Sequence, residues 1–280
     1  MANDPTDLST RPIDLGRIDV RELEQQVMGR MARGSGTRAP LSTKLARQMT
    51  GLSDTFLADE NALRHRAIDR LLREGVTASE IIDYVIPEIA ADLGRRWQED
   101  HISFVEVTIG SARLQEAVRG LVVRELSDNF GGSRTKLGAG SKVDQVSRVL
   151  LVIPRSEDHT LGAFIAADQF RRAGYHVDIA VDWHPKEISA NLRQRNYAMI
   201  GLTVGRSGTL ASARSLVDLI RADMMKVTPI VLGGCLIETG KDLKETTGVD
   251  HVVGSVREAL DICGLNIVEL DPPHQLMADH

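Results

Sequence analysis

The chain has 280 residues, of which 42% are hydrophobic and 26% charged, a composition typical of a folded globular protein. Its net charge of −5 gives it little attraction for phosphates, so direct DNA binding is disfavoured. The sequence contains no run of about 18 apolar residues that could span a membrane and no secretory signal. Only two cysteines are present, Cys235 and Cys263, too few for a cysteine-built zinc site and compatible with a reducing compartment. We therefore expect a cytoplasmic protein that does not associate with membranes.

The N-terminal half is predicted to be helical after a polar tail. Residues 1–41 are rich in Gly, Pro, Ser and Thr, which predicts a mobile tail. Residues 42–127 carry apolar side chains at helical spacing, which predicts an all-α helical-bundle domain. Two expected helix starts in this domain place a hydroxyl three residues before a carboxylate, the pattern of a capping box. The two pairs are Thr77 with Glu80 and Ser103 with Glu106.

The C-terminal half is predicted to be an α/β domain. Residues 128–145 are rich in Gly, Ser and charge and are expected to form a linker. Over residues 146–270, short β-branched runs alternate with amphipathic segments, which predicts a flavodoxin-like, doubly wound sheet of five parallel strands. The expected strands are 149–153, 177–181, 199–204, 229–232 and 251–253, and the expected helices are 160–172, 185–193, 209–222, 238–246 and 256–263. Residues 271–280 are expected to form a second tail.

Ligands of open parallel sheets bind at the carboxyl ends of the strands, and three loops at that edge carry unusual residues. An imidazole such as that of His159 can bind a metal through one ring nitrogen while the other donates a hydrogen bond to a nearby carboxylate. Glycines would let a bulky ligand approach the backbone closely. Taken singly, His159 and Thr203 are also ordinary residues for capping a helix, and a Gly-Gly pair is an ordinary turn. The loop residues are Glu157, Asp158, His159 and Gly162, then Thr203, Val204 and Gly205, then Gly233 and Gly234.

These loops resemble those of cobalamin-binding domains, with Glu157-x-His159-x-x-Gly162 matching an Asp/Glu-x-His-x-x-Gly motif and Gly233-Gly234 matching a Gly-Gly pair. The resemblance implies that His159 is the lower ligand of cobalt and that Glu157 or Asp158 is its hydrogen-bond partner. It further implies that Thr203 contacts the nucleotide tail of the cofactor and that the Gly-Gly pair forms the floor of the channel for that tail. The chain departs from the family where Thr203-Val204-Gly205 replaces Ser-x-Leu. This departure leaves open whether the tail contact is altered and whether the cofactor is a cobalamin or haem. The sequence does not determine whether a cobalamin would be the adenosyl, methyl or hydroxo form.

The helical half carries a second part of the resemblance. The segments 93–97 and 102–106 are similar to the part of a helical cap that lays a tryptophan over the upper face of the corrin. This similarity implies that Trp97, and with it Glu106, faces the cofactor. Two simpler alternatives stay open, because a tryptophan at a helix end often buries its ring in the bundle and Glu106 is already explained by the capping box with Ser103.

Residues 97–115, together with the polar tail, resemble most the AerR/PpaA-type antirepressors of purple bacteria. The resemblance implies a light- or redox-responsive regulator, not an enzyme, that binds a CrtJ/PpsR-type repressor of photosynthesis genes. Two alternatives share the same domains: a corrinoid carrier for methyl transfer, and a sensor in which His159 binds haem iron. An adenosylcobalamin mutase is disfavoured, because it would need a substrate barrel of about 250 residues.

Overall fold

The computed structural model of the protein divides into two compact units, Met1–Arg134 and Thr135–His280, which we call the helical unit and the sheet unit. The structure describes residues 43–131, 147–155, 157–223, 228–234 and 242–266. The two predicted tails, most of the predicted linker and Cys235 lie outside these ranges. Among the residues within them, no helix is long and apolar enough to cross a bilayer.

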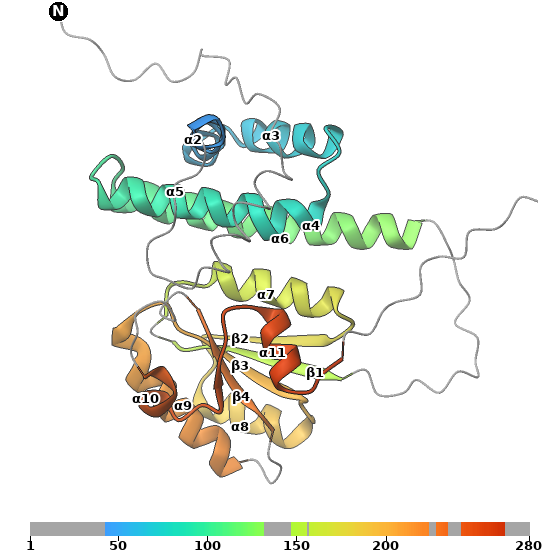
Figure 1. Ribbon diagram of the computed structural model, residues 1–280, viewed down its shortest axis with the longest axis vertical. Helices are drawn as coiled ribbons and strands as arrows, with labels where there is room; N and C mark the ends of the chain where they lie inside the picture. The colour runs from blue at the N-terminus through green and yellow to red at the C-terminus, as the bar shows by residue number, and fades with distance from the viewer. Residues whose placement is uncertain (1–42, 132–146, 156, 224–227, 235–241, 267–280) are drawn as a thin grey trace, which may run out of the picture. The chain divides into compact units, whose positions relative to one another are not determined.

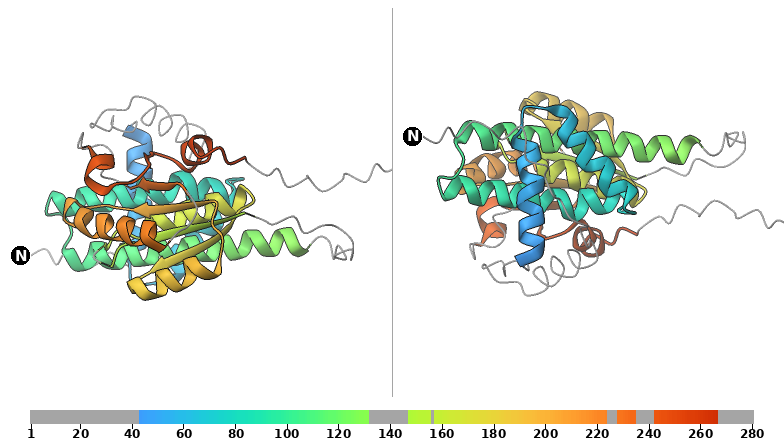
Figure 2. Two further views of the ribbon diagram at one scale, coloured as in Figure 1. Left: turned by 90° about the horizontal axis from the view of Figure 1, so that it is seen from below. Right: turned by 90° about the horizontal axis from the view of Figure 1, so that it is seen from above.

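The helical unit is built mainly from four longer helices (Figure 1). Helices α5 and α6 lie side by side, and α2 crosses them, as Figure 2 shows. Their apolar stripes meet in a buried core that includes Leu52, Ile82, Leu93 and Leu114. The elements are α2 (Thr43–Leu57), α3 (Asn61–Arg73), α4 (Ala78–Glu80), the π-helical η1 (Ile81–Val85), α5 (Ile86–Gln98) and α6 (Phe104–Gly131).

Both predicted capping boxes are present. The backbone N–H of Thr77 donates to Oε2 of Glu80 at 2.8 Å, and the N–H of Glu80 donates to Oγ1 of Thr77 at 3.2 Å. The N–H of Ser103 donates to Oε2 of Glu106 at 2.7 Å, and the N–H of Glu106 donates to Oγ of Ser103 at 3.2 Å. Because each pair satisfies two otherwise unpaired N–H groups, these four residues fix where α4 and α6 begin.

Helix α6 is longer than the sequence predicted. It continues to Gly131, so the first four residues of the expected linker, 128–131, are helical. The sequence between Asp128 and Phe130 holds no Gly or Pro, and glycines follow only at 131 and 132. The helix therefore ends at the first strong helix breaker, which is the usual place.

The sheet unit has the predicted fold, a five-stranded parallel sheet in the order β2-β1-β3-β4-β5 with helices on both faces. Figure 1 shows α7 on one side of the sheet and α8 and α9 on the other. The strands are β1 (Arg148–Ile153), β2 (His176–Val181), β3 (Met199–Thr203), β4 (Ile230–Gly233) and β5 (His251–Val252). The helices are α7 (Leu161–Arg172), α8 (Pro185–Gln194), the 3₁₀ turn η2 (Ser207–Thr209), α9 (Leu210–Asp223), α10 (Leu243–Thr247) and α11 (Val256–Ile262).

Alternation along the strands creates two hydrophobic layers. Val149 and Leu151 of β1 pack into the layer with Phe170 of α7, while Leu150 and Val152 pack into the opposite layer with α8 and α9. The chain leaves β1 toward β2 on one side and later returns to β3 on the other, so the strand order reverses between β1 and β3. Ligands of such sheets bind at this switch point, between the loops that follow β1 and β3.

One helix begins later than predicted. The sequence pattern placed a helix over 238–246, whereas α10 covers Leu243–Thr247. Its start is fixed by Asp242, whose side chain accepts the N–H of Glu245 at 3.0 Å. Residues 238–241 of the expected helix lie outside the described residues.

Candidate cofactor site

The loops after β1 and β3 meet at the switch point, where His159 lies against the backbone of Gly205. A Cβ atom added at Gly205 would lie 2.8 Å from Cβ and Cγ of His159. Real Cβ atoms do not approach other heavy atoms so closely, so any side chain at position 205 would displace the imidazole. The replacement of the family's leucine by Gly205 thus coincides with the place where His159 packs.

The imidazole of His159 is held by a buried carboxylate. Its Nδ1 lies 2.7 Å from Oε1 of Glu157, and the backbone N–H of His159 donates to the same oxygen at 2.9 Å. The Glu157 side chain is fully buried, whereas 57% of the His159 side chain is exposed. Since Glu157 engages Nδ1, Nε2 is the ring nitrogen that can bind a metal.

The second oxygen of Glu157 ties the two loops together. Oε2 accepts the backbone N–H of Gly205 at 2.7 Å and lies 3.1 Å from Oγ1 of Thr209. Burial alone would raise the pKa of Glu157, but the hydrogen bonds from the backbone of Gly205 and of His159, and from the side chains of His159 and Thr209, outweigh it and lower the pKa. The carboxylate is therefore ionised at neutral pH, and Nδ1 of His159 carries the proton of their hydrogen bond.

Asp158, the alternative partner, does not contact the imidazole. Its side chain is 78% exposed and pairs with Arg206, with 3.1 Å between Oδ2 and Nη2. The loop after β1 turns so that Glu157 points inward and Asp158 points to solvent. Of the two carboxylates, only Glu157 can orient His159.

A cavity of about 360 Å³ runs from His159 into the layer between the sheet and the helices α7 and α11. Its walls consist largely of small or apolar residues. Except for Glu157 and Asp158, every sheet-unit residue expected at the site lines this cavity. A Cβ added at Gly162 would have no described heavy atom within 4 Å, apart from its own chain neighbours and helix backbone. The predicted residues that line the cavity are His159, Gly162, Thr203, Val204, Gly205, Gly233 and Gly234.

Two observations test whether this cavity fits a corrinoid with a nucleotide tail. Oγ1 of Thr203 is buried and has no hydrogen-bond partner among the described residues, although it lies on a residue of the cavity wall. A buried hydroxyl without a partner is costly, so a ligand that offers a polar atom there would stabilise the site. Small lining residues such as Gly162, Ala163 and Ala166 keep the cavity open beside that hydroxyl, as a channel for the nucleotide tail would require. The residues present therefore fit such a group.

The floor of the cavity requires glycine at one position. Gly234 has φ of +125°, and an added Cβ would lie 2.3 Å from the carbonyl oxygen of Val204. The N–H of Val204 donates to the carbonyl of Gly233 at 3.0 Å, which continues the pairing of β3 with β4. Gly234 is thus needed to bring two loops into contact at the edge of the sheet.

Sequence reasoning missed some of the site. Thr209 was not among the expected site residues, but its hydroxyl is buried beside Glu157. The wall formed by Ala163, Ala166 and Gly201 was also missed. Gly162, Ala163 and Ala166 are small residues at helical spacing directly after His159, and this run was the available signal.

In the helical unit, Trp97 is exposed. Its exposed fraction is 44% and that of Phe104 is 67%, and their ring centroids lie 6.2 Å apart. The alternative that Trp97 buries its ring in the bundle is therefore wrong. Glu106 accepts hydrogen bonds from the backbone N–H and the hydroxyl of Ser103, and these lower its pKa. Glu106 therefore caps the start of α6 together with Ser103. Its contact with a cofactor stays a prediction.

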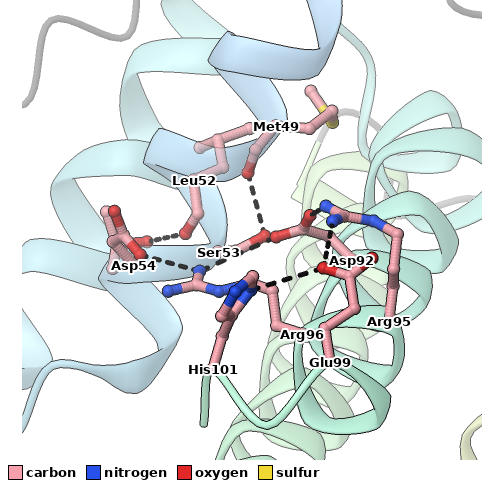
Figure 3. A network of polar contacts seen from close by, with 10 residues as sticks. Met49, Leu52, Ser53, Asp54, Asp92, Arg95, Arg96, Glu99 and His101 are labelled. Carbon is pink, nitrogen blue, oxygen red and sulfur yellow. Dashed lines mark hydrogen bonds and ion pairs between the residues drawn. The ribbon is translucent and has the colours of Figure 1, made fainter.

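The end of α5 that carries Trp97 is anchored by a polar network (Figure 3). Nη1 of Arg96 donates to Oδ1 of Asp54 at 2.8 Å and lies 3.7 Å from Oδ2 of the buried Asp92, which also pairs with Arg95. His101 lies just beyond, 65% exposed, with its Nδ1 3.3 Å from Oε2 of Glu99. These contacts join α2 to the last turn of α5, so the segment that presents Trp97 is anchored to α2.

Comparison with known proteins agrees with this geometry. The family described as "B12 binding domain" matches residues 147–263. The chain is 29% identical over 181 residues to an uncharacterised 20.5 kDa protein in the bchF-crtJ intergenic region of Rhodobacter capsulatus, a match that covers 65% of this chain and 88% of that protein. The fold is similar to that of a monomethylamine corrinoid protein from Methanosarcina barkeri, with a TM-score of 0.57, 13% identity and coverage of 75% of this chain and 94% of that chain.

Proposed function

Since the model of the B12-binding domain family matches residues 147–263, we propose that the chain is a cobalamin-dependent, light- or redox-responsive regulator and not an enzyme. It would act by binding a CrtJ/PpsR-type transcriptional repressor, without contacting DNA itself. The single observation that carries the cofactor part of this proposal is the His159–Glu157 pair at the mouth of the cavity.

In this proposal His159 binds cobalt through Nε2, and Glu157 sets its tautomer and orientation. Thr203 offers its buried hydroxyl to the nucleotide tail, and Gly233 and Gly234 form the floor beneath it. Bound cobalamin would supply, in its adenosyl and methyl forms, a cobalt–carbon bond that visible light breaks. Ionised Glu157 favours a proton on Nδ1, so Nε2 is the ring nitrogen that would face the metal.

The helical unit would act as the cap in this proposal. Trp97 and Phe104 present an exposed aromatic pair on a helix end that Arg96 and Asp54 anchor. Exposed aromatic rings on an anchored segment suit the covering of a large flat ring system. Loss of the group bound to cobalt would change the packing of Trp97. The helical unit would then present a different surface to the repressor before and after that change.

The choice of a regulator over a methyl carrier is supported by the Rhodobacter capsulatus relative. Its name places it in the bchF-crtJ intergenic region, and the partner proposed here is a repressor of the CrtJ/PpsR type. The likeness to the monomethylamine corrinoid protein is a likeness of fold and does not favour the carrier.

The cofactor is tested by adding adenosylcobalamin in the dark to the full chain, to His159→Ala and to His176→Ala. His176 is an exposed histidine at the first residue of β2, the opposite edge of the sheet, and serves as the matched control. We expect wild type and His176→Ala to bind with the same absorption spectrum and His159→Ala to lose both the ligand-dependent spectral change and roughly tenfold or more in affinity. Equal binding by His159→Ala, or a Soret band in the purified protein, would overturn the assignment.

The regulatory part is tested by measuring the affinity of the loaded protein for a CrtJ/PpsR-type repressor before and after illumination. We expect the absorption spectrum and the affinity to change together, and both changes to be absent in His159→Ala. Unchanged affinity, or methyl transfer to an added thiol by a partner methyltransferase, would overturn the regulator in favour of a carrier.

A further inference from the structure

A stripe of exposed residues runs along α6 on the side opposite its buried face. Val105, Val123 and Ile109 are 63%, 63% and 40% exposed. The α6 stripe consists of Val105, Ile109, Ala112, Glu116, Arg119 and Val123, all exposed. These six positions are separated alternately by four and three residues, so they form one seam of a helix. The opposite side of the helix, with Gly110, Leu114, Val118 and Leu121, is buried within the bundle.

The order of residues along the α6 stripe is complementary to itself when reversed. In an antiparallel pair of α6 helices related by a two-fold axis, positions whose numbers add up to 235 lie opposite each other. Glu116 of one copy then meets Arg119 of the other, and Ala112 meets Val123. Because a two-fold contact is isologous, each of these pairs forms twice.

In this register the four layers between positions 112 and 123 each join either two apolar residues or two opposite charges. A parallel pair in register would instead set Glu116 against Glu116 and Arg119 against Arg119, which is destabilising.

We infer that the α6 stripe is the docking surface for a second copy of this chain, and that the two α6 helices pair antiparallel about a centre between Glu116 and Arg119. From Val105 to Val123 the seam is about 27 Å long, enough for several layers of side chains. Pairing would remove two exposed valines and an isoleucine per chain from water, and the two central ion pairs would set the register. The inference uses only the helical unit and does not depend on the proposed cofactor.

Charge reversal of the full chain tests the register by sedimentation velocity. Glu116→Arg and Arg119→Glu each create two like-charged layers, so each variant alone should raise the dimer dissociation constant roughly tenfold or more. A mixture of the two variants should form a heterodimer, because both central layers then join opposite charges. The double variant Glu116→Arg/Arg119→Glu should form a homodimer for the same reason.

The mixture separates contact between copies from effects within one helix. In the mixture each chain still carries its own like-charged pair at 116 and 119, so recovery of the dimer can come only from the partner. Arg47→Glu, a charge reversal at an exposed position of α2, is the control and should dimerise like wild type. Circular dichroism should show the same helix content in all variants.

Three results would overturn the inference. The wild-type chain could be monomeric, with or without cobalamin, at the highest concentration that keeps it in solution. The single variants could dimerise as well as wild type. The single variants could dissociate while neither their mixture nor the double variant recovers the dimer, which would exclude the antiparallel register.

Discussion

One carboxylate oxygen, Oε1 of Glu157, accepts both the backbone N–H of His159 at 2.9 Å and its Nδ1–H at 2.7 Å. Two hydrogen bonds to a single oxygen fix the loop and the ring together. The position of Nε2 is therefore set before any ligand binds, which lowers the ordering cost of binding.

Replacing Glu157 with Gln should damage the site while keeping its shape. An amide has one oxygen, so its NH₂ group must face either the two donors of His159 or the N–H of Gly205, and a buried donor stays unpaired. We expect cobalamin affinity to fall about 10- to 100-fold and the free energy of unfolding of the sheet unit to fall by about 1–3 kcal/mol. The exposed Asp158→Asn is the matched control and should bind like wild type; equal binding by the two variants would contradict the role of Glu157.

The same carboxylate predicts how stability depends on pH. Folding lowers the pKa of Glu157 below its ordinary value of 4.5, so the folded state binds this proton less readily than the unfolded state. The contribution of ionised Glu157 to the free energy of unfolding is thus fully present above pH 4.5. It is lost as the pH falls through the lower pKa of the folded state. Urea unfolding followed by Trp183 fluorescence in a Trp97→Phe background should show wild type and Glu157→Gln converging as the pH drops below 4.5. A constant difference over that range would show that the charge of Glu157 contributes nothing.

Gly205 provides a steric test of how His159 is placed. A Cβ at this position would lie 2.8 Å from the imidazole carbon Cγ, so Gly205→Ala must push the ring away or shift the loop. We expect weaker cobalamin binding and a loss of about 1–3 kcal/mol in the free energy of unfolding. Gly208→Ala, three residues along and with no described atom near its added Cβ apart from its own chain neighbours and helix backbone, should leave both unchanged. If the two alanine variants bound cobalamin equally well, the packing of His159 on Gly205 would have no functional consequence.

Removing the hydroxyl of Thr203 should raise the stability of the cofactor-free protein and lower its affinity for cobalamin. Its buried Oγ1 has no partner among the described residues, so Thr203→Val removes an unsatisfied group and should stabilise the cofactor-free sheet unit by about 1 kcal/mol. The same change should weaken cobalamin binding, because the tail would lose a hydrogen bond. Thr203→Ser keeps the hydroxyl and should bind like wild type. Tighter binding by the valine variant would mean that the hydroxyl points away from the tail.

Local patterns in the sequence determined the elements of both units. The strand and helix periods predicted a five-stranded parallel sheet, and the spacing of Thr77 with Glu80 and of Ser103 with Glu106 predicted two helix starts. These features depend on residues a few positions apart, and so they can be recognised from neighbours alone. The end of α6 and the start of α10 were predicted less well, because helix ends depend on single breaking or capping residues.

Only the tertiary structure decided which residues meet at the candidate site. Glu157 and Asp158 are adjacent in the sequence, and the turn after β1 alone sends one inward to His159 and the other to Arg206. The contact of Glu157 with Gly205 joins residues 48 positions apart, because parallel pairing of β1 with β3 brings the two loops to one edge. Periodicity fixes which face of an element is buried, whereas the order of strands fixes which loops become neighbours, and that order follows from packing the whole sheet between its two layers of helices.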